Sequence, residues 1–387
     1  MSFLPTEDSV PSVSSAISYF QSPNVDVSVK SAYFDPIYPV VPLSDGSPIH
    51  FRFSSNENYY SDMRNSILEL KVKVFKSDGN LVTDSDNVSY DDGGIMNTLF
   101  QNIQVFVNDT LVSSEDGTLD AKLAVFTTET FRVAARPSHH FFQLNQFMPP
   151  ALKIDIKFSP SLPRLVFRKL EKAAPDVKLT ISEAVLHIRK VKIVSSLALA
   201  VEKIKASGSN LKIMIPKLMP TARIIPTGSL SFAESSLTTY GHLPSKVILG
   251  LVKTSNQLGS YESSPFKFEL LHLSSLHLKV NGQPIYSLNF SDQSYRLLYE
   301  MSMRTLEETK QFLKMDYPMK KWIRDSSLIC LDISGTPDLS LIKDGTLRLD
   351  LTFSQATDAS VSLIIIGFQE TFLEIDKSGA VFLPIAP

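Results

Sequence analysis

The stretch from residue 67 to residue 75 constrains the fold more than any other, because apolar and charged residues alternate without interruption along its central residues, 68–74. On an extended chain its apolar side chains face one side and its charged side chains the other: Leu68, Leu70, Val72 and Val74 against Glu69, Lys71 and Lys73. A period of two predicts a β-strand with one buried face and one solvated face. Residues 48–53 alternate in the same way. Such a chain is expected to build sheets that pack on a core.

Short apolar runs of strand length recur along the whole chain, with turn residues between them. Asn108-Asp109 and Asn281-Gly282 each follow a run that ends in Val, and both are typical of two-residue β-hairpin turns. This spacing favours β-sandwiches over alternating strands and helices. Strands are predicted at residues 103–107, 111–112, 152–158, 177–181, 185–194, 246–252, 266–273, 276–280, 328–333, 346–353 and 362–368.

Two segments depart from this β pattern. Between residues 195 and 206 the apolar residues Leu197, Ala200, Val201 and Ile204 recur at helical spacing, and Gly208 follows as a stop signal. Residues 293–315 are the other helical candidate. The first helix would connect two β halves, and the second would be inserted into the later half. The length of 387 residues accommodates two sandwiches of similar size.

The composition excludes several classes of protein. A single cysteine, Cys330, cannot form an intrachain disulfide or a cysteine-ligated zinc site. The first ten residues show no basic segment followed by an apolar one, so we expect a protein made inside the cell and not secreted. The longest apolar run, residues 363–368, is about a third of a membrane span, so no membrane partner is expected. A net charge of −2 gives no general attraction to nucleic acid.

No catalytic motif is present, and we expect neither an enzyme nor a cofactor. His139-His140 could form a metal pair, but adjacent residues of a strand face opposite sides, so a solvated loop is the favoured interpretation. The acidic stretch 84–94 has oxygen ligands for calcium but lacks the glutamate of an EF-hand, and it is interpreted as an exposed loop. Cys330 lies in an apolar run and is expected to be a core thiol.

Charge is unevenly distributed, because residues 151–222 carry 14 Lys and Arg against 5 Asp and Glu. This basic stretch predicts either a surface facing packaged nucleic acid or another anion, or simply the polar faces of strands and of a helix. The second interpretation is favoured, since no aromatic platform for bases accompanies the charge. The candidate residues are Lys153, Lys157, Arg164, Arg168, Lys169, Lys172, Arg189, Lys190 and Lys192, and Lys203 and Lys205 extend the stretch.

An ordered set of segments resembles a known family. The sequence NTLFQNIQVFVN at residues 97–108 and GHLPSKVILGLV at residues 241–252 carry the resemblance, together with SPFKF at 264–268. The other matching segments are residues 45–51, 59–62, 68–74, 78–79, 223–229, 259–261, 280–282, 289–290, 345–349 and 373–376. In this order, over residues 17–377, they resemble the double jelly-roll major capsid proteins of Polinton/Maverick elements and related adintovirus-type viruses.

The resemblance implies an all-β fold of two tandem jelly rolls, each an eight-stranded antiparallel sandwich, with short helical insertions. Its expected domains are an N-terminal arm at 1–34, a first jelly roll at 35–194, a helical connector at 195–209, a second jelly roll at 210–377 and a C-terminal tail at 378–387.

The function that the resemblance implies is structural. Three copies would form a pseudo-hexameric capsomer, and capsomers would assemble an icosahedral shell around double-stranded DNA, so the protein would be located in the virion capsid. The implied partners are further copies of the chain, a penton or minor capsid protein, and packaged DNA bound without sequence specificity. The alternatives are a β-sandwich binding protein, a penton-type minor capsid protein, or an enzyme on a jelly-roll scaffold.

Overall fold

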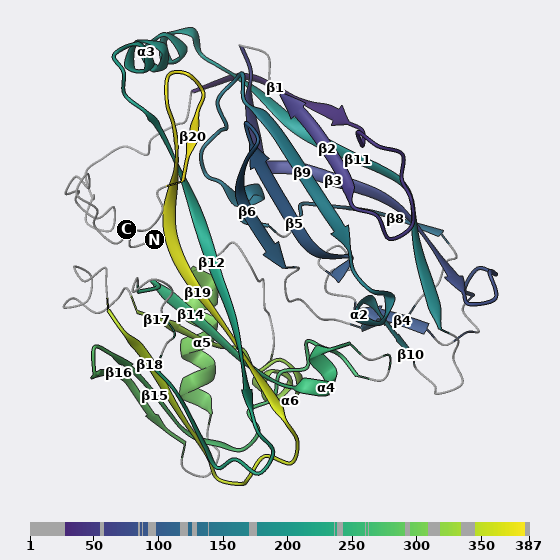
Figure 1. Cartoon of the computed structure of the whole chain (residues 1–387), viewed down its shortest axis with the longest axis vertical. Coiled ribbons are helices and arrows are strands. Elements are labelled where there is room, and N and C mark those ends of the chain that lie inside the picture. Colours follow the sequence, from purple (N-terminus) through teal and green to yellow (C-terminus); the bar gives the residue numbers. More distant parts are fainter. Residues whose placement is uncertain are drawn as a thin grey trace.

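The computed structural model describes most of the chain as two β-sandwiches, one from each half (Figure 1). The described residues are 28–54, 58–83, 86, 88–91, 98–116, 123–125, 130–137, 139–169, 176–235, 237, 243–259, 261, 263–290, 295–308, 318–333 and 345–383. None of the helices in these ranges has the length and apolarity needed to span a bilayer.

The first sandwich has two antiparallel sheets of four strands each, in the orders β1-β11-β3-β8 and β2-β9-β5-β6. A small sheet, β10-β4-β7, is added beside them. The strands are β1 (Val29–Ile37), β2 (Ile49–Ser54), β3 (Tyr60–Lys76), β4 (Val88–Asp91), β5 (Phe100–Val107), β6 (Thr110–Asp116), β7 (Leu123–Val125), β8 (Thr130–Ala135), β9 (Lys153–Pro160), β10 (Phe167–Lys169) and β11 (Val177–Ile193).

The second sandwich repeats this arrangement with the sheets β12-β19-β14-β17 and β13-β18-β15-β16. A two-residue strand, β20 (Val381–Phe382), pairs with β19. The other strands are β12 (Leu211–Ile225), β13 (Ser231–Glu234), β14 (Lys246–Lys253), β15 (Leu273–Val280), β16 (Gln283–Asn289), β17 (Ile329–Asp332), β18 (Leu347–Phe353) and β19 (Val361–Ile375).

The two sandwiches have the same topology. When the eight main strands of each half are numbered along the chain, one sheet has the order 1-8-3-6 and the other 2-7-4-5, in both halves. Eight antiparallel strands connected in this way form a jelly roll. The expected all-β fold of two tandem eight-stranded jelly rolls is therefore confirmed.

Each jelly roll is closed around a hydrophobic core, and the apolar face of β3 contributes to the core of the first one. Leu68, Leu70, Val72 and Val74 are all fully buried, while Glu69 and Lys71 lie on the opposite face. Strand β14 differs, because six consecutive residues from Val247 are buried. Its outer face is covered by Phe268 and neighbouring apolar residues, so the sheet is apolar on both sides.

The two long strands β12 and β19 join the sandwiches (Figure 1). They pair over their full length, from Leu211 with Ile375 to Ile225 with Val361. One end of this ribbon belongs to the second core, but Ile213, Ile215 and Leu373 are buried in the core of the first sandwich. The second half of the chain thus completes the core of the first half.

The helices are short and lie at the ends and edges of the sheets. They are η3 (His140–Gln143, a 3₁₀ turn), α2 (Pro163–Val166), α3 (Ser195–Ala206), α4 (Thr254–Gln257), α5 (Arg296–Glu308) and α6 (Met319–Asp325). Helix α3 connects the sandwiches as predicted, and α5 confirms the described part of the helix predicted at residues 293–315. Residues 309–315 of that prediction lie outside the described ranges.

The two predicted hairpin turns are confirmed in detail. Asn108 and Asp109 have φ of 46° and 65°, and Asn281 and Gly282 have φ of 48° and 82°. Two successive residues with positive φ form the turn whose twist matches that of the flanking strands. The predicted strands 177–181 and 185–194 are one strand, β11, with a register irregularity between Ile181 and Glu183 that interrupts the sequence pattern.

Three expectations are corrected by the structure. The strand predicted at residues 266–273 is absent up to residue 272, because Leu271 and His272 have φ of 49° and 59° and cannot extend β15 backwards. The segment expected as an arm, residues 1–34, contributes its last six residues to β1, which pairs with β11. The expected tail, residues 378–387, contains β20.

Candidate interaction surface

The chemistry-bearing residues of the sequence do not gather into a reactive site. Within the described part of the chain, no three side chains of His, Cys, Asp or Glu come together as a possible metal site. Cys330 is fully buried in the second half, and burial raises the pKa of its thiol. A buried thiol is unreactive, in agreement with the expected core role.

The pair His139-His140 is not in a solvated loop, because both side chains are fully buried. His139 caps the 3₁₀ turn η3: its Nδ1 accepts the backbone N–H of Phe141 at 3.1 Å. The His140 ring lies 6.4 Å from the ring of Phe368, which belongs to β19. His140 therefore packs the first sandwich against the β12–β19 ribbon, while His139 stabilises the turn.

The acidic stretch 84–94 falls largely outside the described residues. One of its carboxylates that is described, Asp86, accepts a backbone hydrogen bond from Thr83 at 2.7 Å and an ion pair from Lys76 at 3.0 Å. These partners lower the pKa of Asp86 although partial desolvation opposes them. The carboxylate of Asp86 thus stabilises the local backbone turn at residues 83–86.

A pocket of about 480 Å³ opens at one end of the second sandwich. Leu270, Tyr295 and Ile323 form part of its wall, and the ion pair of Lys253 with Asp358 (2.9 Å) lies at its edge. The mixture of apolar, basic and acidic groups favours no single class of ligand.

The basic stretch is distributed over several elements. Lys153 and Lys157 are on β9, Arg164 is on α2, Arg168 and Lys169 are on β10, and Arg189, Lys190 and Lys192 are on β11, while Lys172 lies outside the described residues. Strands β9 and β11 belong to opposite sheets of the first sandwich. The structure therefore does not bring these residues together on one sheet.

Most of these cationic side chains lie next to a carboxylate or an aromatic ring. Lys153 pairs with Asp109 and Lys169 with Asp176, each at 2.6 Å, and Arg189 pairs with Asp62. Lys157 lies 5.0 Å above the ring of Phe106.

Lys190 differs from the rest because it is buried. Its Nζ donates to Ser61 Oγ at 3.1 Å and lies 5.1 Å from the ring centre of Phe53. Burial lowers the pKa of Lys190 to about 8, and the nearby Asp35 only partly opposes this.

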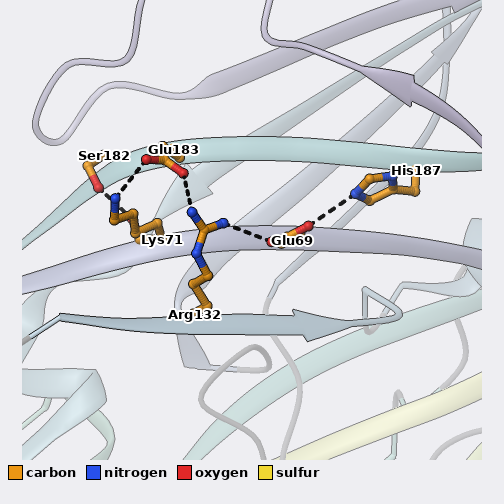
Figure 2. Close-up of polar contacts among 6 residues, drawn as sticks. All are labelled: Glu69, Lys71, Arg132, Ser182, Glu183 and His187. Carbon is orange, nitrogen blue, oxygen red and sulfur yellow. Dashed lines mark hydrogen bonds and ion pairs between the residues drawn. The ribbon is translucent and has the colours of Figure 1, made fainter. Parts of the chain in front are cut away.

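Charged residues on the outer face of the β1-β11-β3-β8 sheet form a connected network (Figure 2). Arg132 on β8 donates to Glu69 on β3 and to Glu183 on β11, at 2.9 Å each. Lys71 pairs with Glu183 at 2.8 Å, and His187 lies 3.2 Å from Glu69.

The network links three strands on a solvated face. Hydrogen bonds from His187 and Arg132 lower the pKa of Glu69, and Lys71 does the same for Glu183. Such exposed pairs stabilise little individually, but they satisfy one another and leave this face polar.

The edge strand of the same sheet is apolar instead. Tyr33 and Phe34 on β1 and, beyond it, Tyr38, Val40 and Val41 are exposed, Tyr38 by 66%. We call these five residues the β1 edge. Exposed large apolar residues gathered on a sheet edge mark a surface that another chain can cover. Sequence reasoning missed it because β1 is exposed on both faces and shows no alternation.

Comparison with known proteins bears on the fold. No model of a protein family matches the sequence, and no curated protein matches it either. Among solved structures, the mavirus major capsid protein is similar at a TM-score of 0.51 and 10% identity, covering 98% of this chain and 96% of that chain. The Faustovirus major capsid protein is similar at a TM-score of 0.59 and 8% identity, covering 92% of each chain.

The chain has the fold of double jelly-roll capsid proteins.

A chain of the Sputnik virophage structure is also similar, at a TM-score of 0.58 and 9% identity, covering 98% of this chain and 94% of that chain. The similarity extends over nearly the whole length of both compared chains, so it includes both jelly rolls of this chain and the segment that connects them. At sequence identities of 8–10%, the similarity shows that the fold is shared.

Proposed function

We propose that this chain is the major structural subunit of a viral capsid. Three copies would form a pseudo-hexameric capsomer, and capsomers would assemble an icosahedral shell. The observation that carries the proposal is the repeated topology, since two jelly rolls with one strand order stand in a single chain. A ring of three such chains presents six similar sides, which suits packing in a closed lattice.

The β1 edge is the surface that we assign to contacts between copies. Its five large side chains are exposed at the border of the sheet, and Lys30 and Asp35 are the two charged residues of β1, whereas the adjoining sheet face is occupied by its own ion pairs. Exposed sheet edges form intermolecular contacts when they are not covered. A penton or minor capsid protein would meet the same lattice at its vertices.

The proposal assigns no catalytic activity and no cofactor. Support comes from the placement of the candidate groups, since Cys330 and the His139-His140 pair are buried and the carboxylates of Asp62, Asp86 and Glu183 are held in ion pairs. The protein would be made inside the host cell and located in the virion. The domains that go with this function are a first jelly roll at residues 35–194, a connector at 195–209 and a second jelly roll at 210–377, with β1 and β20 adding strands from the flanking segments.

We propose that the shell encloses double-stranded DNA and that the basic stretch does not bind this DNA directly. The carboxylate partners of Lys153, Lys169 and Arg189 and the net charge of −2 support this view. We expect the purified protein not to retain duplex DNA in a mobility-shift assay at 150 mM salt or at about a third of that concentration. Retention that weakens steeply with salt would contradict this part of the proposal.

Assembly itself is tested by mass photometry and negative-stain microscopy of the purified full chain. We expect trimers with a hexagonal outline, or shells. The variant Phe34→Glu with Tyr38→Glu on the β1 edge should shift the population to monomers, and Leu258→Glu, at an exposed residue of the second half, is the matched control. A protein that stays monomeric at every salt concentration and pH would overturn the proposal.

A further inference from the structure

Helix α3 leaves three of the four residues of its apolar stripe exposed, and the fourth, Val201, is half-buried. The stripe consists of Leu197, Ala200, Val201 and Ile204, at the spacing of one helix face. Leu197 is 40% and Ile204 is 57% exposed, and none of the three apolar clusters of the described residues includes a residue of α3. An isolated helix of twelve residues is only marginally stable in water unless an apolar face is packed. We therefore expect another segment to pack on this stripe.

The chain outside the described residues ends beside this helix. Residues 1–27 lead into Ser28, whose carbonyl accepts the backbone N–H of Val194 at 2.9 Å. Val194 immediately precedes the first residue of α3. Fully extended, 27 residues reach at most about 90 Å, and α3 is about 18 Å long. The N-terminal segment therefore reaches the whole stripe from its point of attachment.

The sequence of that segment matches the stripe. Val13, Ala16, Ile17 and Phe20 recur at the same spacing as Leu197, Ala200, Val201 and Ile204. Residues 1–27 contain Glu7, Asp8 and Asp26 and no Lys or Arg, while Lys203 on α3 and Lys30 at the start of β1 are exposed. Helix α3 also carries Glu202 and Lys205, so its formal charge is +1, opposite in sign to the −3 of the acidic side chains in residues 1–27.

We propose that residues 13–20 dock on the apolar stripe of α3 in the same chain, with Val13, Ile17 and Phe20 against Leu197, Val201 and Ile204. The tether makes the contact intramolecular, with an effective concentration in the millimolar range, so a small apolar surface is sufficient. This contact does not depend on capsid assembly, and it holds for the single chain.

Thiol labelling tests the contact, because Cys330 is buried and leaves an introduced cysteine as the reporter. In the full chain, the Ile204→Cys thiol should react with a maleimide at least tenfold more slowly than the Leu199→Cys thiol, which lies on the opposite face of α3 and is 63% exposed. Removal of residues 1–27 should abolish this difference. Because the truncation could impair folding, Ile17→Glu with Phe20→Glu provides a second test and should have the same effect, with Ser15→Glu as its control.

Two results would overturn the proposal. The first is rapid labelling of the Ile204→Cys thiol in the full chain, or slow labelling that neither variant changes. The second is slow labelling that becomes fast on dilution, since a second copy would then cover the stripe. A chain carrying both Ile17→Cys and Ile204→Cys should form its disulfide within one chain on oxidation, and a disulfide-linked dimer would contradict docking in the same chain.

Discussion

At the scale of single residues, Asn108 and Asn281 stabilise equivalent hairpin turns in the two jelly rolls. Each is the first residue of a hairpin turn, and each side-chain Oδ1 accepts a backbone N–H at the start of the strand beside it. The acceptor distances are 2.9 Å to Lys153 and 2.8 Å to Thr346. The backbone N–H groups of both asparagines donate back to the same residues. The sequence likeness between the two turns thus reflects the same hydrogen-bond pattern.

This pattern predicts how substitutions of Asn281 rank. Asn281→Ala loses the side-chain hydrogen bond and replaces asparagine, which tolerates the left-handed region, by a residue that tolerates it less well; together these effects should lower the free energy of unfolding by about 2 kcal/mol. Asn281→Gly keeps the conformation and loses only the hydrogen bond, so about 1 kcal/mol is expected. Urea unfolding of the unassembled protein measures both. Equal losses for Ala and Gly would show that the positive φ of 48° contributes nothing.

The buried Lys190 predicts a stability that rises with pH. Its pKa is about 8 in the folded chain against 10.5 for the ordinary side chain. Between these values the unfolded chain holds more protons than the folded one, so raising the pH favours folding. The full effect is about 3 kcal/mol. The charge on Lys190 therefore opposes folding at neutral pH.

Lys190→Met should remove this dependence and raise the stability at pH 7, because no charge remains to be buried. Urea unfolding from pH 7.5 to 9.5 measures it, below the range in which Tyr60 and Tyr295 ionise, since burial raises their pKa. Arg189→Met, next to Lys190 on β11 but paired with Asp62, is the control and should keep the slope. A flat profile for the unmodified chain would refute the prediction.

At the scale of elements, the predictability of a strand follows from how its faces are buried. Strand β3 has one buried and one solvated face, so its alternation was evident in the sequence. Strand β12 was missed because Pro216 and Pro220 interrupt its pattern, although an edge strand that pairs only with β19 tolerates them. The β1 edge was missed for a different reason: exposure of both faces removes the period of two.

Predictions about sites were limited by tertiary contacts that no local pattern encodes. The ring of His140, for example, lies against Phe368, more than two hundred residues away along the chain. The carboxylate partners of the basic stretch likewise come from other strands and loops, as Asp62 does for Arg189. The sequence was therefore informative about the number and kind of elements, and less so about which surfaces they leave exposed.

Strand β14 contains a glycine that its packing requires. A β-carbon on Gly250 would lie 2.7 Å from the ring of Phe268, which covers the outer face of the sheet. Gly250→Ala should therefore lower the free energy of unfolding by about 1–3 kcal/mol through overpacking. Adding Phe268→Leu, which shortens the facing side chain, should recover part of the loss in a thermal melt. Additive losses in the double variant would show that the clash is not the cause.

At the scale of the whole molecule, the two jelly rolls share structure and do more than stand side by side. The β12–β19 ribbon extends from the second sandwich into the first (Figure 1), where Leu373 is fully buried. Asn108 on the first hairpin also donates to the carbonyl of Gly379 at 2.6 Å, and Gln146 accepts the backbone N–H of Met214 at 2.7 Å. These contacts join the two jelly rolls at more than one place, as the proposed role in a capsid wall would require.

This coupling predicts that the two jelly rolls unfold together. If each had an independent core, calorimetry of the unassembled chain would resolve two transitions. Since Ile213, Ile215 and Leu373 of the second half fill the core of the first, loss of either sandwich exposes apolar surface of the other, and one transition is expected.

Leu373→Ala should lower the free energy of unfolding by about 2–5 kcal/mol and move that single transition as a whole. Leu349→Ala, at a fully buried residue of the second core, should shift the same transition. Separate transitions, or a Leu373→Ala effect on only one of them, would mean that the ribbon connects the jelly rolls without coupling their stability.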